Sequence, residues 1–216
     1  MHRRSKELLV FYILPIVAVV LSLALQAEYL MTILLFWGFP ALFLSFLAKK
    51  HVKKALLFAA IGTPFLMSLD LIFYFTQSWY VFTDTYRLLG IIAWEDILYF
   101  FFWVYFPVLF WEHFYDSNKK DPLWRKRMRF LVYLFVFSTL MISFSWLFAP
   151  HLLLIPYFYL CSTIVLILLP LLFESIFNPK LAFKFLGVGL HFAFSGILYE
   201  LTALHLGLFT RVVPQS

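Results

Sequence analysis

The chain consists mainly of long apolar segments separated by short polar ones. Seven segments have the roughly 20 residues needed to cross the hydrocarbon core of a bilayer: 8–26, 29–48, 55–76, 88–111, 130–148, 152–173 and 183–208. Because they lack the alternating pattern of barrel strands, we expect helices. The links at 27–28 and 150–151 are short enough for tight hairpins. The pattern predicts an all-α polytopic membrane helix bundle of about seven transmembrane helices, in a single domain over 1–216.

The composition supports a membrane protein and argues against a soluble one. With 64% hydrophobic and 13% charged residues in 216, a soluble domain could not bury its apolar surface. The net charge of +6 does not indicate nucleic acid, because the basic residues lie in short loops between apolar spans. The only cysteine, Cys161, excludes an intramolecular disulfide. Residues 1–6 resemble the start of a signal peptide, but the apolar run that follows is long enough to span and has no A-x-A site, so we expect an uncleaved first helix.

The basic residues fall almost entirely on one side of the predicted bundle. With a cytoplasmic N-terminus, 15 of the 17 Lys and Arg lie on the inner face and only Arg87 and Arg211 on the outer face. The inner residues are Arg3, Arg4, Lys6, Lys49, Lys50, Lys53, Lys54, Lys119, Lys120, Arg125, Lys126, Arg127, Arg129, Lys180 and Lys184. This asymmetry predicts an N-terminus inside, a C-terminus outside and an odd number of spans, in a bacterial inner (cytoplasmic) membrane. Contact with anionic lipids would account for the basic loops themselves.

Four acids fall within the predicted spans: Asp70, Glu95, Asp96 and Glu200. Three of them are separated by the same number of positions from a charged residue at the inner end of their own helix: Asp70 from Lys54, Asp96 from Glu112, and Glu200 from Lys184. At the helical rise of about 1.5 Å per residue, each lies about 24 Å above the inner interface. The spacing predicts one layer of acids in the outer half of the bilayer. Neighbouring residues on a helix differ by about 100° in direction, so the sequence leaves open which of Glu95 and Asp96 faces the interior.

Acids within a span are costly and usually face a bundle interior or a cavity, so they are candidates for a functional site. The alternative is that they reach headgroup water or cross-link helices through hydrogen bonds. Crowded carboxylates with few cations nearby hold protons more readily, and a protonated acid in an apolar cavity is a proton donor. His191, deeper in the last span, is more typical of a core residue than of a catalytic one.

Several kinds of cofactor site are missing from the sequence. It has no G-x-G-x-x-G motif after a strand, no H-E-x-x-H motif and no Cys/His cluster, so we expect no cofactor and no metal. A retinal protein would need a lysine deep in the last span, but Lys184 lies at its inner end.

Two stretches of the chain indicate an internal repeat. Residues 70–79 and 200–209 each begin with an acid, carry Gln77 or Gly207 seven positions later, and end on Trp79 or Phe209 nine positions later. Each stretch closes a predicted inside-to-outside helix that follows an outside-to-inside helix. The repeats, 29–112 and a truncated 152–209, have the same orientation, and an axis along the membrane normal would place Asp70 and Glu200 at equal depth.

The first repeat resembles the membrane-embedded lycopene (carotenoid) cyclase domain family of the heterodimeric and fused, non-flavin type. The residues that fit in order are Asp70 through Trp79, Gly90, Glu95, Asp96, Tyr99 and Phe100. Ala93 replaces the family's proline, Gln77 replaces its first glycine, and Leu69 stands where tryptophan usually precedes the acid. The sequence ends before a second Glu-Glu helix, so we expect the paired acidic helices of the family to be only half present.

The resemblance implies redox-neutral cyclisation of a linear carotene end group, with a hydrophobic isoprenoid or carotenoid as substrate. Glu95 would donate the proton, and Asp96, Asp70 and Glu200 would hold or accept protons. Trp79, Trp94, Tyr99 and Phe209 could contact the substrate and stabilise a carbocation by cation–π contact, although an outer interfacial belt would also explain these aromatic residues.

Two other functions stay open from the sequence. The unfinished second repeat favours a non-catalytic membrane subunit or lipid-binding protein, which would work with a second membrane subunit or as a homo-oligomer. Intramembrane acids also serve as relays in proton-coupled transporters.

Overall fold

The computed structural model describes residues 2–76, 80–81, 85–88, 90–115, 122–155, 157–158, 164, 168, 171–172, 175–176 and 179–210. The main helices are α1 (His2–Ala24), α2 (Tyr29–Ile33), α3 (Phe39–Leu47), α4 (Val52–Phe75), α5 (Trp94–Phe114), α6 (Pro122–Phe148) and α9 (Pro179–His205). Shorter helical turns are η1 (Leu34–Gly38), η2 (Lys49–His51) and η3 (Pro150–Leu153), and the short strands are β1 (Tyr80–Val81), β2 (Arg87–Leu88), β3 (Ile92–Ala93) and β4 (Phe209–Thr210).

The fold is an all-helical bundle, as the hydropathy pattern predicted. Five helical segments of the described chain are long and apolar enough to cross a membrane: Ser5–Ala24, Tyr29–Leu47, Lys49–Phe75, Trp94–Phe114 and Pro179–His205. Helix α6 adds a shorter apolar stretch, Val136–Phe148. Most of the predicted span 152–173 lies outside the described residues, and its first residues, 152–153, belong to the 3₁₀ turn η3.

Two predicted spans differ from the observed helices in their boundaries. The span predicted at 88–111 begins only at Trp94, because Gly90 adopts a φ of 74° in a turn that folds β2 back on β3. Arg87 pairs with Ala93 and Leu88 with Ile92 in this antiparallel hairpin. The last helix spans 179–205 rather than 183–208, and Gly207, with a φ of 69°, follows its end.

The second predicted span, 29–48, is divided by a π-helical turn. Pro40 has no N–H group to bond to the carbonyl four residues earlier, and the N–H of Phe39 bonds to Leu34 O, five residues earlier. The widened turn, η1, carries Trp37 and Gly38, both buried. At Gly38, an added Cβ would lie 3.4 Å from the ring of Phe102 in α5, so the missing side chain allows close packing of the two segments.

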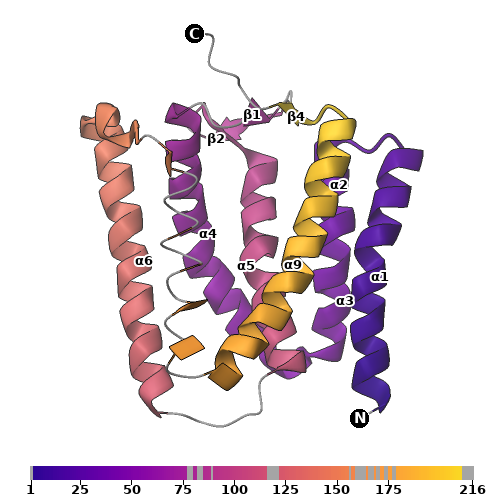
Figure 1. The fold of residues 1–216 in the computed structure, drawn as a ribbon. Coiled ribbons are helices and arrows are strands. Elements are labelled where there is room, and N and C mark those ends of the chain that lie inside the picture. Colours follow the sequence, from indigo (N-terminus) through magenta and orange to yellow (C-terminus); the bar gives the residue numbers. More distant parts are fainter. Residues whose placement is uncertain are drawn as a thin grey trace.

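Helix α5 lies in the middle of the bundle, between α4 on one side and α2, α3 and α9 on the other (Figure 1). Helix α6 packs beyond α4, and α1 packs against α9 and η1 at the opposite edge. The core is rich in aromatic side chains, among them Phe11, Phe36, Trp37, Phe110 and Tyr199. The outer surface keeps large apolar side chains exposed, such as Leu57, Phe137 and Ile197, as expected for a surface in contact with lipid.

The two ends of the bundle differ in charge. We call the end where α1 begins the basic end, because η2 and the start of α4 place the exposed residues Lys49, Lys50 and Lys53 there. The described chain ends in β4 at the opposite end, where β4 pairs with β1 (Figure 1). In that pair Tyr80 lies opposite Thr210 and Val81 opposite Phe209, so the segments that follow α4 and α9 meet there.

Candidate functional site

The acid pair Glu95 and Asp96 lies in the first turn of α5, directly after the extended residue Ala93. Both carboxyl side chains are buried, each residue being 3% exposed. The N-terminus of a helix favours negative charge, because its unpaired N–H groups and its dipole point toward the acids. The sequence left open which of the two faces the interior, and the structure places both of them inside.

Asp96 is held by a residue that the sequence argument missed. The hydroxyl of Tyr29, at the start of α2, donates a hydrogen bond of 2.5 Å to a carboxylate oxygen of Asp96. Tyr29 is itself buried, at 4% exposed. This bond joins residues far apart in the sequence, and it fixes the start of α2 against the start of α5.

Glu95 is turned toward a different segment. The hydroxyl of Thr85 donates a hydrogen bond of 2.7 Å to Glu95 Oε2. Nearby, Arg87 Nη1 donates to the carbonyl of Ile91 at 2.9 Å and so braces the β2–β3 turn. The neighbouring acids are therefore bound by groups from different segments, and each keeps its own orientation.

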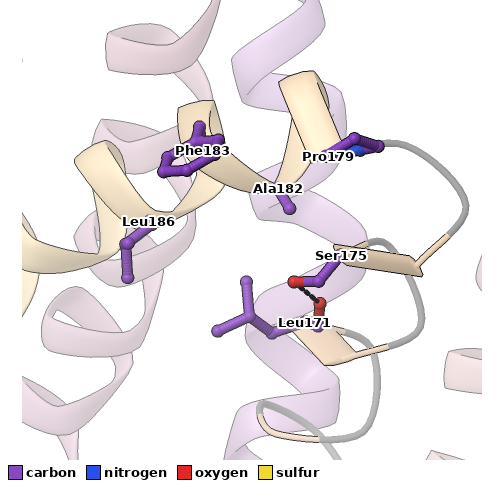
Figure 2. Close-up of a pocket in the computed structure, with 6 residues that line it drawn as sticks. All are labelled: Leu171, Ser175, Pro179, Ala182, Phe183 and Leu186. Atoms are coloured by element: carbon purple, nitrogen blue, oxygen red, sulfur yellow. Dashed lines mark hydrogen bonds between the residues drawn. The ribbon is translucent and has the colours of Figure 1, made fainter.

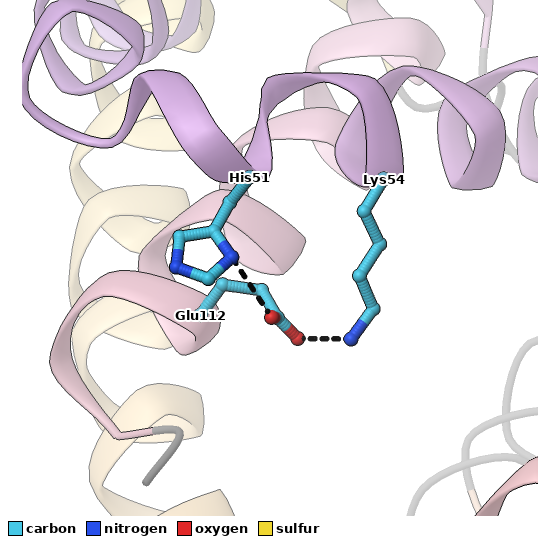
Figure 3. Close-up of polar contacts among 3 residues, drawn as sticks. All are labelled: His51, Lys54 and Glu112. Atoms are coloured by element: carbon cyan, nitrogen blue, oxygen red, sulfur yellow. Dashed lines mark hydrogen bonds and ion pairs between the residues drawn. The ribbon is translucent and has the colours of Figure 1, made fainter. Parts of the chain in front are cut away.

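An ion pair at the basic end aligns α4 with α5 and so determines the height of Asp70. Lys54 Nζ lies 2.6 Å from Glu112 Oε1, and His51 Nδ1 lies 3.2 Å from Glu112 Oε2 (Figure 3). Asp70 follows Lys54 along α4 by the same number of positions as Asp96 precedes Glu112 along α5. Because the two helices are antiparallel neighbours, both acids lie about 24 Å from this ion pair along their helices. Asp70 is buried at 7% exposed.

Helix α9 is aligned with α5 in the same way, but it turns Glu200 outward. Lys184 Nζ donates to the carbonyl of Tyr115 at 3.0 Å, and further along α9 the ring of Tyr199 stacks on Tyr99 at 5.4 Å. Glu200 thus lies at a height similar to that of Asp96, as the spacing predicted. Its side chain is exposed, however, whereas Tyr199 beside it is 1% exposed. We name the buried acids Asp70, Glu95 and Asp96 the acid layer, and Glu200 is not part of it.

Aromatic rings lie one to two helical turns after the acid pair along α5, on the side of the basic end. We call Trp37, Tyr99, Trp103 and Tyr199 the aromatic cluster: Trp37 contacts the other three rings at centroid distances of 5.5–6.4 Å, and Tyr99 contacts Trp103 at 5.9 Å. Of the four aromatic residues that the sequence indicated, only Tyr99 belongs to this cluster.

The other three predicted aromatic residues are not brought into the cluster by the described structure. Trp94 is half-buried at the first position of α5. Trp79 lies outside the described residues, and for Phe209 only the backbone, paired in β4, is described. Tyr29 was missed because an aromatic residue at the end of a span resembles an interfacial belt, and nothing in the sequence distinguished Trp37 and Tyr199 from the many other aromatic residues within the spans. Pro40, which cannot continue the hydrogen-bond ladder beside Trp37, was the available signal for the π turn.

A pocket of about 280 Å³ among the described residues lies away from the acid layer. It is lined by Leu171, Ser175, Pro179, Ala182, Phe183 and Leu186, around the start of α9 (Figure 2). The Ser175 hydroxyl bonds to the carbonyl of Leu171 and leaves the lining apolar. None of the site residues predicted from the sequence lines this pocket. In the part of the chain that the structure describes, no group of three or more His, Cys, Asp or Glu could hold a metal ion.

The described fold and its acid layer define an all-helical protein with several helices that could cross a membrane, and with carboxylates buried near one end of the bundle. No protein-family model, no curated protein and no solved structure matches the chain.

Proposed function

We propose that the chain is a membrane enzyme that cyclises the end group of an isoprenoid or carotenoid by redox-neutral proton transfer. The observation that carries this proposal is the buried acid pair Glu95–Asp96, held by Thr85 and Tyr29 directly above the aromatic cluster. Carboxylic acids in an apolar, aromatic surrounding can give and take protons without water competing for the intermediate. A lipid-dissolved hydrocarbon would reach them from the bilayer.

The chemistry divides between the two acids. Glu95 gives its proton to a carbon of the terminal double bond, and the resulting carbocation closes a carbon–carbon bond with a second double bond. Asp96 then takes a proton from the carbon next to the new cation, which restores a double bond. The product is an isomer of the substrate, and the enzyme is reset when the proton passes from Asp96 back to Glu95. Asp96 suits the role of base, because a hydrogen bond from Tyr29 stabilises its carboxylate.

The aromatic cluster would stabilise the carbocation. Tryptophan and tyrosine rings attract a cation over their faces when it lies within about 6 Å of the ring centre. Trp37, Tyr99 and Tyr199 are almost fully buried, so the attraction would act in a desolvated site, where it is strongest. Asp70, buried on α4 at the height of Asp96, would keep a proton available within the same layer.

We further propose seven spans with the basic end in the cytoplasm of a bacterium and the C-terminus outside. The exposed Lys49, Lys50 and Lys53 at the end where α1 begins support this orientation, because positive residues concentrate in cytoplasmic loops. The acid layer would then lie in the outer half of the bilayer. Labelling of single cysteines placed at residues 28 and 50, in a Cys161→Ser background, tests it: a membrane-impermeant reagent should label intact cells only at residue 28.

The direct test is expression of the full chain in cells that accumulate lycopene, followed by chromatography of the pigments. We expect cyclised products from the unmodified chain and a loss of at least about 100-fold for E95Q and for D96N, the range typical of a missing general acid or base. E28Q is the matched control, because Glu28 is an exposed acid in the α1–α2 turn. Unchanged lycopene, with the protein present in the membrane, would refute a lycopene cyclase.

A non-catalytic membrane subunit is the second candidate, and the position of Glu200 favours it. Glu200 lies on the exposed side of α9, between the exposed apolar residues Ile197 and Leu201. A helix of a second subunit or of another copy could cover this surface and shield the acid from lipid. Affinity purification in mild detergent tests this: a second membrane protein retained by the unmodified chain and lost with E200L would favour a subunit, whereas cyclisation by the purified chain alone would exclude an obligate partner.

A further inference from the structure

The pocket around the start of α9 opens on the outer surface of the bundle. Its lining runs from Phe183, which is 75% exposed, to Ala182, which is buried. Figure 2 shows Leu171 and Ser175, from the segment before α9, opposite Ala182. Ile176, next to Ser175, is 76% exposed as well. The opening therefore lies in an apolar surface of the kind that contacts lipid, where hydrocarbon chains of a bilayer would reach it directly.

Two lysines of α9 lie beside the side of the helix that lines the pocket. Four lining residues recur at intervals of three and four positions and so share one side of α9: Pro179, Ala182, Phe183 and Leu186. Lys180 and Lys184 each follow one of these residues, so they form a second stripe, rotated by about 100° from the first. Lys180 is exposed. Lys184 is half-buried and uses one of its three ammonium hydrogens to bond the carbonyl of Tyr115.

The pocket lies at the basic end of the bundle, far from the acid layer. Helix α9 begins at that end (Figure 1), where Lys49, Lys50 and Lys53 are also exposed. Lys184 precedes Glu200 along α9 by a distance of about 24 Å, given the helical rise. Because the end of a spanning helix lies near the lipid headgroups, an apolar pocket bordered by lysines at this level can contact both parts of a lipid molecule.

We propose that this pocket binds one acyl chain of an anionic phospholipid, and that Lys180 and Lys184 contact its phosphate. The volume of about 280 Å³ is close to the lower limit for small-molecule sites, so the pocket would hold part of one chain rather than a whole lipid. Contacts with the chain give little preference over the surrounding bilayer, because lipid tails are as apolar as the lining. The preference for an anionic lipid therefore comes from the lysines. This second site does not depend on the proposed cyclisation.

The experiment places the full chain in nanodiscs of phosphatidylcholine that contain a small fraction of phosphatidylglycerol with a photoreactive diazirine in one acyl chain. After illumination, mass spectrometry of peptides locates the attached lipid. We expect adducts concentrated in residues 171–186, and unlabelled phosphatidylglycerol should compete for them more strongly than added phosphatidylcholine. K180Q should reduce that preference about fivefold, the contribution of one lysine near anionic lipid. K50Q is the matched control, because Lys50 is exposed at the same end on η2, and it should leave the preference unchanged.

A second pair of variants tests the pocket itself. S175F places an aromatic ring in the pocket, so the adducts in residues 171–186 should be lost. I176F adds a ring at the neighbouring exposed position, which does not line the pocket, and should retain them. If S175F does not assemble, the competition measured with the unmodified chain and with K180Q still decides the question.

Three results would overturn the proposal: adducts spread evenly over the exposed faces of α6 and α9, equal competition by the two lipids, or an unchanged preference in K180Q. A copurified membrane protein in place of the adducts would also overturn it, because a protein would then cover the pocket. The pigment assay is independent of this experiment, so a failure of the lipid site and a failure of the proposed cyclase can be told apart.

Discussion

Replacing Lys54 with methionine tests how the ion pair at the basic end holds α4 against α5. Glu112 is buried, with its side chain 5% exposed, whereas the side chain of Lys54 is 42% exposed. In K54M the Glu112 carboxylate stays buried with His51 as its remaining partner at 3.2 Å. Removing one partner of a buried ion pair typically destabilises by about 3–5 kcal/mol, and because His51 still donates we expect a loss of about 2–3 kcal/mol for K54M.

Replacing Glu112 instead of Lys54 should destabilise the chain less. In E112Q the amide oxygen can still accept from Lys54, and the lysine can also be hydrated at its exposed side, so we expect a loss of about 1 kcal/mol. The assay is unfolding of the purified chain in detergent with increasing denaturant, followed by tryptophan fluorescence at pH 8. K53M is the matched control, because Lys53 is exposed one residue away, and it should change stability by less than about 0.5 kcal/mol. The reasoning would be refuted if E112Q destabilised the chain as much as K54M.

Two further predictions concern α4 and α9. In G62A the new Cβ would lie 2.9–3.0 Å from the methyl groups of Val104, so we expect a loss of about 1–3 kcal/mol in the same unfolding assay; G189A, where the added Cβ meets nothing within 4 Å, should not be destabilised. Cells that express E200Q should produce nearly as much cyclised pigment as cells that express the unmodified chain, because Glu200 is exposed and lies outside the acid layer. If E200Q lost as much activity as D96N, Glu200 would belong to the reactive site.

The sequence predicted the fold better than it predicted the site. Long apolar runs indicate helices that could cross a membrane, because the bilayer imposes both length and composition. The boundary before Trp94 could not be found in this way, since residues 88–93 are also apolar and only the conformation of Gly90 separates hairpin from helix. The equal spacing of Asp70 from Lys54 and of Asp96 from Glu112 gives the two acids comparable heights once the ion pair joins Lys54 to Glu112, because helical rise converts residue number into distance.

What spacing could not reveal is direction around the helix axis. Glu200 and Tyr199 are neighbours, and a rotation of about 100° separates the exposed acid from the buried hydroxyl. A repeat that aligns Glu200 with Asp70 therefore aligns heights without aligning faces. Asp70 lies on a buried side of α4, whereas Glu200 lies on the exposed side of α9. The direction of each side chain around its helix axis decides whether the acid can act in a shared interior, and the local motif alone does not contain that direction.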